Sequence, residues 1–209
     1  MGQAASQWWV ELLRALPSIV TAGTAIFGVF LAKAGLEKWR RETIGKRKAE
    51  LAEEVLADFY QARDVINAAR SPGSFSEEGN TRQKAERETE ADTRRLNAYY
   101  SVAERLFNKG EFFAELHARR YRYLALFGTN SVKSYDELFR IRSEITTSVQ
   151  MLVMTYDKRQ FGSLPQDCRN WEGIIWEGIN KDDRIPARLT EIVEAVEKTC
   201  RPAIQEAVQ

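Results

Sequence analysis

An uncharged run near the N-terminus is the feature that most constrains how this chain can fold. Eighteen consecutive residues from Ala15 to Ala32, ALPSIVTAGTAIFGVFLA, carry no charge. At about 1.5 Å per residue in a helix, a run of this length nearly matches the ~30 Å hydrocarbon core of a bilayer. The sequence therefore predicts a single transmembrane helix over residues 15–34, preceded by a short N-terminal segment, residues 1–14.

The residues on either side of this run are those that membrane interfaces favour, because indole rings prefer the headgroup region and basic residues collect on the cytoplasmic side. Residues 33–48 carry a net charge of +5, which predicts a basic juxtamembrane helix over residues 35–48. The positive-inside rule then places the N-terminus outside and the C-terminal domain in the cytoplasm. The predicted anchor and lipid-headgroup contacts are Trp8, Trp9, Lys33, Lys38, Trp39, Arg40 and Arg41.

Three alternatives stay open for this region. The run is only moderately apolar, so it also suits the buried core helix of a soluble protein. Residues 32–34, Ala-Lys-Ala, have the small-x-small form of a secretory cleavage site, although the preceding residues lack the net basic charge of a signal peptide. Residues 1–6 fit the short N-myristoylation pattern, which requires a cytosolic N-terminus, opposite to the topology above.

Small residues recur every four positions along the predicted span, which lets membrane helices approach closely. A helix–helix interface in the membrane, and with it a homo-oligomer, is one interpretation of this spacing. The other is that Gly, Ala and Thr are common in any membrane helix. The candidate interface residues are Ser18, Thr21, Thr24 and Gly28.

Residues 49–209 predict a cytoplasmic helical domain. Apolar residues repeat at three- and four-residue steps, and no stretch alternates with the period of two that strands show. The predicted fold class is all-α, with one N-terminal transmembrane helix followed by a four- to five-helix bundle. The expected core positions are Leu51, Val55, Phe59, Ala62, Ile66, Ala69, Leu96, Tyr99, Ala103, Leu106, Phe112, Leu116, Tyr123, Phe127, Leu138, Ile141, Ile145, Val149, Leu152, Tyr156, Leu189, Ile192, Val196 and Cys200.

Breakers and charges predict where the helices of this domain end. Pro72 and Gly73 stop the first helix, and residues 71–80 form a loop. The highly charged stretch from Thr81 is expected to begin a solvated helix that becomes amphipathic further on. The remaining expectations are a break at Gly110, a C-cap at Gly128, an N-cap at Ser134, a long connection with one or two helical turns over residues 161–183, and a last helix over residues 186–208.

No pattern of reactive side chains indicates an enzyme. His117 is the single histidine, which excludes two-histidine zinc motifs, and its nearest acid, Glu115, does not have the Glu-x-x-His spacing of di-iron bundles. Cys168 and Cys200 form no CxxC motif and are expected to be reduced thiols. The sequence predicts no cofactor and no metal; an enzyme using Glu111, Glu115 and His117 is the alternative.

Cationic and aromatic residues interleave over residues 117–123, as they do on nucleic-acid or anionic-lipid surfaces. Against a nucleic-acid partner, residues 49–209 have a net charge of −4, whereas such proteins usually present a basic face. A packed helix whose arginines extend to solvent is the other interpretation. The candidate basic-aromatic surface consists of Arg119, Arg120 and Arg122.

Taken together, these patterns predict a membrane-anchored helical scaffold or regulatory protein. It would bind a protein partner or itself at the cytoplasmic face and contact membrane lipid through the juxtamembrane residues. The alternative is an oligomeric transmembrane effector or pore controlled by its cytoplasmic domain, which the polar side chains at Ser18, Thr21 and Thr24 would favour.

Overall fold

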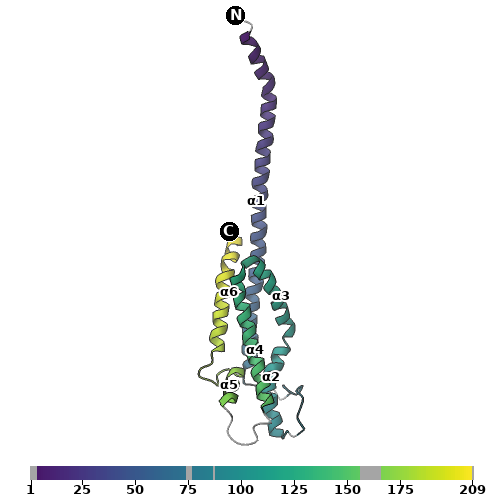
Figure 1. Ribbon diagram of the computed structural model, residues 1–209, viewed down its shortest axis with the longest axis vertical. Helices are drawn as coiled ribbons and strands as arrows, with labels where there is room; N and C mark the ends of the chain where they lie inside the picture. The colour runs from purple at the N-terminus through teal and green to yellow at the C-terminus, as the bar shows by residue number, and fades with distance from the viewer. Residues whose placement is uncertain (1–3, 74–76, 87, 156–165, 209) are drawn as a thin grey trace. The chain divides into compact units, whose positions relative to one another are not determined.

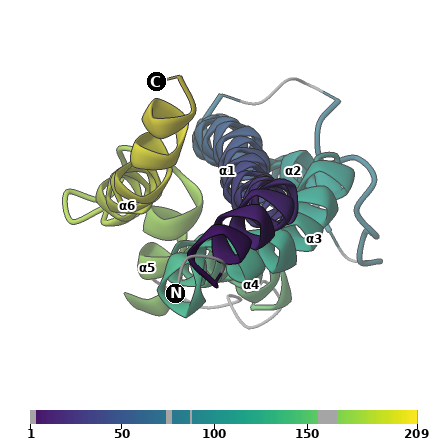
Figure 2. The same ribbon diagram turned by 90° about the horizontal axis from the view of Figure 1, so that it is seen from above.

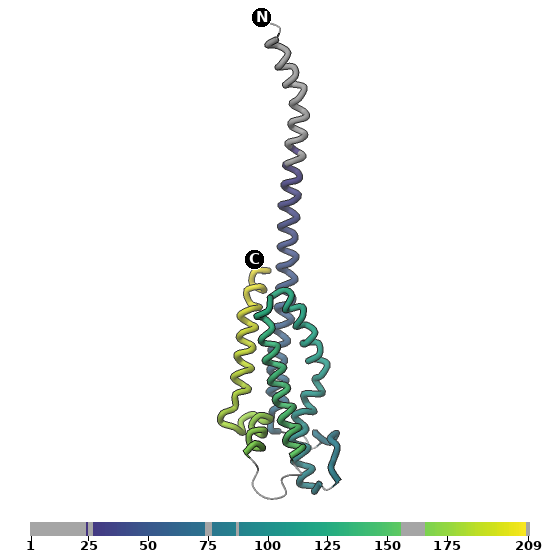
Figure 3. Tube along the Cα trace, viewed as in Figure 1, coloured from purple at the N-terminus to yellow at the C-terminus, as the bar shows by residue number. Residues whose placement is uncertain are grey.

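The computed structural model describes residues 4–73, 77–86, 88–155 and 166–208, without the side chains of residues 4–23, 25, 26 and 208 (Figure 3). The secondary structure of this described part is helical and contains no β-strand, which confirms the all-α fold class. Its elements are α1 (Ala4–Arg70), α2 (Glu90–Phe107), α3 (Gly110–Phe127), the 3-10 helix η1 (Thr129–Val132), α4 (Lys133–Met154), α5 (Gln166–Ile175) and α6 (Ile185–Val208) (Figure 1).

The chain divides into two compact units, residues 1–47 and residues 48–209. We call the first the N-terminal unit and the second the body. The N-terminal unit consists of the first part of α1, and the body contains the rest of α1 together with α2 to α6. Helix α1 runs without interruption from Ala4 to Arg70, so the predicted helices over residues 15–34 and 35–48 and the first helix of the body are one helix.

The body is a helical bundle around one hydrophobic core. Helix α4 packs against α2, α5 and α6, and α3 and α6 lie to either side of it (Figures 1 and 2). The apolar stripe of α1 from Leu51 to Ala69 is buried as expected, and Phe59 meets the ring of Tyr135 on α4 edge to face, with 4.8 Å between ring centroids. Each large aliphatic or aromatic side chain buried here stabilises the fold by about 1.5–3 kcal/mol.

The periodicity of the sequence located most of this core correctly. The predicted stripes of α2, α4 and α6 are buried through Leu106, Leu152 and Cys200. In α3 the fully buried phenylalanine is Phe113, whereas Phe112, the expected core residue, is partly buried. The predicted core position Tyr156 lies outside the described residues.

Three local predictions were wrong. The charged stretch from Thr81 is not helical in its described residues, and α2 begins only at Glu90, where Thr89 and Asp92 form a reciprocal capping box. Ser134 does not cap α4, because η1 leads directly into that helix. The connection predicted over residues 161–183 holds a ten-residue helix, α5, which is longer than the one or two turns expected, so the described part of the body has six α-helices where four or five were predicted.

Candidate interaction surfaces

The N-terminal unit exposes large apolar side chains on every side of its helix. Val29, Phe30 and Leu31 are consecutive, so they point in directions about 100° apart, and each is more than half exposed. Phe27 upstream is 61% exposed, and Leu36 and Trp39 downstream are exposed to a similar degree. A helix that is apolar all round needs an apolar cover, which this unit does not provide for itself.

Among the described residues, no helix is long and apolar enough to span a membrane. The side chains of residues 15–23, 25 and 26, more than half of the predicted span, lie outside those that the structure describes. The same holds for Trp8, Trp9, Ser18 and Thr21. Of the predicted membrane interface, Thr24 is exposed, and Gly28 has nothing within 4 Å of the position that a Cβ atom would take.

The predicted headgroup contacts after the run are all exposed. They are Lys33, Lys38, Trp39, Arg40 and Arg41. Lys38 lies 3.7 Å from the carboxylate of Glu42, and Nε of Arg41 donates to the carbonyl oxygen of Glu37 at 3.4 Å. Both contacts are solvent-exposed and therefore weak, so the positive charge of this segment is largely uncompensated.

The predicted basic-aromatic surface on α3 is balanced by carboxylates of neighbouring helices. Arg119 pairs with Asp58 and lies 3.3 Å from Glu54, both on α1, and Arg122 lies 3.7 Å from Glu54. Arg120 pairs with Asp136 of α4 at 2.8 Å. Burial raises the pKa of Asp58, and the hydrogen bond and charge of Arg119 oppose this shift only in part. These arginines hold α3 against α1 and α4, which leaves little charge for an external anion.

The three residues of the enzyme alternative are exposed on α3. His117 is exposed and stands edge-on to the rings of Tyr121 and Phe139, with centroid distances of 5.8 and 5.1 Å. Neither it nor Glu111 or Glu115 lines any of the three grooves described next. Within the described residues, no three His, Cys, Asp or Glu side chains are placed to hold a metal ion.

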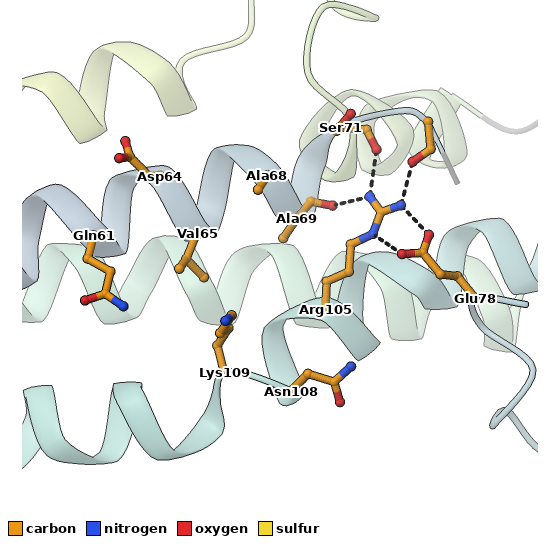
Figure 4. Close-up of a pocket in the computed structure, with 11 residues that line it drawn as sticks. Gln61, Asp64, Val65, Ala68, Ala69, Ser71, Glu78, Arg105, Asn108 and Lys109 are labelled. Carbon is orange, nitrogen blue, oxygen red and sulfur yellow. Dashed lines mark hydrogen bonds and ion pairs between the residues drawn. The ribbon is translucent and has the colours of Figure 1, made fainter. Parts of the chain in front are cut away.

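The largest of these grooves, about 940 Å³, runs along the end of α1 beside the junction of α2 and α3 (Figure 4). Val65 and Ala68 supply apolar surface, and Lys109 projects from the facing side. Arg105 at one end is engaged within the chain, since it pairs with Glu78 and donates to the carbonyl oxygens of Ala69, Ser71 and Gly73 at 3.3, 2.9 and 2.5 Å. The guanidinium thus caps the C-terminal end of α1, and its hydrogen bonds are made within the chain.

A polar groove of about 440 Å³ lies between α4, α6 and the loop before α6. Arg188 reaches Glu137 at 2.7 Å and Glu144 at 2.6 Å, and Arg140 reaches Glu137 at 2.5 Å. Arg140 and Arg188 in this groove are therefore paired with carboxylates of α4.

A third groove, about 600 Å³, is lined by residues of α2, α4 and the segment before α2, and its surface is mostly apolar. Phe107 of α2 and Met154 of α4 line it and are 51% and 72% exposed. Met151 on the next turn back from Met154 is also exposed. Flexible thioether side chains suit surfaces that meet an apolar partner.

Two buried arginines organise the body and were not among the predicted sites. Arg70, the last residue of α1, is completely buried; it donates from Nε to the carbonyl oxygen of Ile174 at 2.8 Å and from Nη2 to Asp183 at 2.7 Å. Arg82 pairs with Glu88 at 2.6 Å, and both side chains are almost fully buried. The hydrogen bonds from Arg82 lower the pKa of Glu88 to about 2, against the opposing effect of burial. A basic residue just before a Pro-Gly break was the only sequence signal for Arg70.

The fold and these surfaces define an all-α protein with two units: an N-terminal helical unit whose described apolar and basic side chains are exposed, and a helical body with a hydrophobic core. Comparisons with protein families, curated proteins and solved structures find no match to this chain. Its function therefore has to be inferred from its own residues.

Proposed function

We propose that this chain is a membrane-anchored helical scaffold or regulatory protein. The N-terminal unit would lie in the bilayer, and the body would bind a protein partner or a second copy at the cytoplasmic face. The observation that supports this proposal best is the set of exposed apolar side chains of α1 from Phe27 to Trp39, which together point in directions all around the helix. Hydrocarbon would cover such a surface on all sides at once, whereas a single partner helix would cover one face.

The charges on either side of the uncharged run support an orientation of the helix in the membrane. Exposed lysines and arginines follow the uncharged run directly, and the segment before it carries one acidic and one basic side chain, Glu11 and Arg14. Basic residues are retained on the cytoplasmic side during insertion. We therefore propose that the body is cytoplasmic and that only the short N-terminal segment crosses the membrane.

Flotation of cell membranes on a density gradient tests the anchor. We expect the full chain to float and to resist extraction by alkaline carbonate. A Phe27→Lys/Phe30→Lys variant should move to the soluble or aggregated fraction, because a charge in a membrane helix costs up to about 3 kcal/mol at its centre. The matched control is Phe107→Lys/Met154→Lys, which places two lysines on exposed apolar positions of the body.

The control variant should float like the wild type. Wild-type chain that stays in the soluble fraction would contradict the anchor. So would a loss of flotation of the same size in both double variants, since that would point to misfolding rather than to a membrane segment.

Thiol labelling tests the orientation, because Cys168 and Cys200 are both buried and should react little in the folded chain. A membrane-impermeant maleimide on intact cells should label Ser6→Cys and spare Asn130→Cys, which lies on an exposed turn of the body. After the cells are opened, both should be labelled. The reverse pattern on intact cells would place the body outside.

Partner binding by the body is supported by the apolar groove between α2 and α4, with exposed Phe107 and Met154. Cross-linking in native membranes, followed by mild detergent extraction, should give a defined higher-mass species. One dominant unrelated protein supports the scaffold, and homo-oligomers alone support self-association. Monomers alone, with cross-linker confirmed to react, would contradict both.

A pore is the second candidate, and the open space beside Gly28, one turn from Thr24, favours it, since a neighbouring membrane helix could approach there. Purified chain in vesicles should then release a trapped dye, and replacing Ser18, Thr21 and Thr24 by Leu should stop the release. Vesicles that hold their dye with wild-type chain inserted would eliminate this candidate.

A further inference from the structure

The basic residues of the N-terminal unit and of the body differ in their surroundings. In the body, ten arginines form ion pairs with carboxylates of the same chain: Arg63, Arg70, Arg82, Arg105, Arg119, Arg120, Arg122, Arg140, Arg188 and Arg201. In the described part of the N-terminal unit, the one ion pair is Lys38 with Glu42. Residues 33–48 carry a net charge of +5, whereas residues 49–209 carry a net charge of −4, so the excess positive charge of the chain is concentrated next to the uncharged run.

Helix geometry sorts these cations further by their distance from the end of the uncharged run. Lys33, Lys38, Arg40 and Arg41, which we call the proximal cations, lie within about 12 Å of Lys33 along the helix axis at ~1.5 Å per residue. Lys46 and Arg47, the distal cations, lie about 20 Å away. At physiological ionic strength the Debye length is about 8 Å, so a charged bilayer surface at Lys33 acts mainly on the proximal cations.

Two exposed apolar side chains stand among the proximal cations. Leu36 and Trp39 are three residues apart on the same side of the helix and are 63% and 62% exposed. An indole ring and basic groups at one depth match the headgroup layer, where the ring can insert between lipids while the cations meet phosphate. Neither a nucleic acid nor an acidic protein would account for the adjoining apolar circumference.

We propose that the proximal cations, together with Leu36 and Trp39, form a binding surface for anionic phospholipid headgroups, so that this chain gathers anionic lipid around its anchor. The inference rests on the proposed membrane anchor and adds the chemical class of lipid to it. The distal cations take little part, because they lie beyond the reach of the surface charge.

The test uses the full chain in phosphatidylcholine vesicles that contain a minority of phosphatidylglycerol. Polymer-bounded discs are cut from these vesicles, purified through the protein, and analysed for the ratio of the two lipids relative to the bulk vesicle. Wild-type discs should be enriched in phosphatidylglycerol at about 0.01 M salt and less so at about 0.15 M, where the Debye length has fallen from ~30 to ~8 Å.

Two double variants remove the same charge at different depths. Arg40→Gln/Arg41→Gln should weaken the apparent association with phosphatidylglycerol by up to about five-fold for each cation removed. At about 0.15 M salt, Lys46→Gln/Arg47→Gln should stay within about two-fold of the wild type, since both positions then lie more than two Debye lengths from the charged surface. Glutamine keeps the helix propensity of the residues it replaces, so α1 should persist in both variants.

Each outcome has a separate meaning. Chain that floats with neutral vesicles but gathers no phosphatidylglycerol overturns this inference and leaves the anchor standing. An equal loss of phosphatidylglycerol enrichment in the two double variants would also overturn it, because the net charge of the chain, and not the depth of each cation, would then determine the enrichment. Chain that fails to float with any vesicle contradicts the proposed function itself. Tight binding of a single-stranded oligonucleotide that displaces phosphatidylglycerol would assign the cations to nucleic acid instead.

Discussion

At the scale of single residues, the body is held together by charged groups placed where solvent is nearly absent. Arg70 shows this most clearly, because its guanidinium joins the end of α1 to the carbonyl oxygens at the end of α5 and to Asp183 before α6. A buried ion pair adds little net stability as a pair, but removing one member leaves the other charge buried and alone.

Replacing Arg70 by Met should therefore lower the free energy of unfolding by about 3–5 kcal/mol, measured by urea denaturation of the full chain in mild detergent. Removing the stranded carboxylate as well, in Arg70→Met/Asp183→Asn, should recover part of this loss. The control is Arg63→Met, whose exposed partner is Asp64 and whose loss should cost less than about 1 kcal/mol. Equal effects at Arg63 and Arg70 would contradict the role given to burial.

Glu88 should make the stability of the body depend on acidity. Its pKa is lowered from 4.5 to about 2 by hydrogen bonds from Arg82. A carboxylate with a depressed folded-state pKa stabilises fully above its unfolded-state pKa, and the effect fades as the pH falls. Wild type should thus lose on the order of 1–2 kcal/mol, after allowance for solvent screening, between about pH 4.5 and pH 2.

The comparison variant is Glu88→Gln, which cannot ionise. It should be less stable than wild type near neutral pH, and the difference should shrink through the same acid window in urea denaturation series. A difference that stays constant from neutral pH to pH 2 would show that Glu88 acts through packing and not through its charge.

The buried ion pairs of Arg70 and Arg82 could not be predicted from the sequence. Apolar periodicity is a local signal, so the stripes of α1, α4 and α6 could be predicted from it. The charged residues around Arg82 gave the pattern of a solvated helix, because no local window reveals that Arg82 and Glu88 close on each other in a buried pair. Among candidate surfaces, the exposed N-terminal cations were expected, whereas the grooves depend on helices that meet only in the folded chain.

At the scale of elements, the segment before α2 is held against that helix by hydrogen bonds to a carboxylate side chain. Glu104 of α2 accepts hydrogen bonds from the backbone N–H of Gly79 at 2.6 Å and from the hydroxyl of Thr81 at 2.5 Å. Gly79 has a φ of 77°, and a Cβ there would lie 2.1 Å from the carbonyl oxygen of Asn97. The close approach of this loop to α2 thus requires glycine at position 79 for two reasons: its positive φ and its lack of a side chain.

Gly178 offers a matched comparison, because its φ is 79° but nothing lies within 4 Å of a Cβ placed there. Gly178→Ala should cost about 1–2 kcal/mol, the strain of a left-handed alanine. Gly79→Ala should cost about 1–3 kcal/mol more, since the backbone of Asn97 has to move as well. Urea denaturation measures both, and equal costs would mean that the loop yields without affecting α2.

At the scale of the whole molecule, the two units differ in what stabilises them. Every residue of the main core cluster belongs to the body, and the first of them along the chain is Leu51. The N-terminal unit contributes no described side chain to that cluster. The body should therefore fold without the N-terminal unit.

A chain without residues 1–47 should keep the cooperative urea transition of the body, with a free energy of unfolding within about 1 kcal/mol of the full chain. It should also no longer float with membranes if the anchor is correct. Near-ultraviolet circular dichroism follows the packing of the buried tyrosines. Loss of the cooperative transition would show that the core extends into the deleted residues.

Cys168 and Cys200 lie on α5 and α6, and both are completely buried. Burial also raises the pKa of the Cys200 thiol, which keeps it in its unreactive protonated form. Alkylation of either sulfur thus requires a transient opening of the helix that carries it. The two alkylation rates therefore report how often α5 and α6 open locally. A partner that binds to the body over α5 or α6 would slow the alkylation of the cysteine on that helix. Mass spectrometry of the two cysteine-containing peptides would then locate the binding surface without an engineered probe.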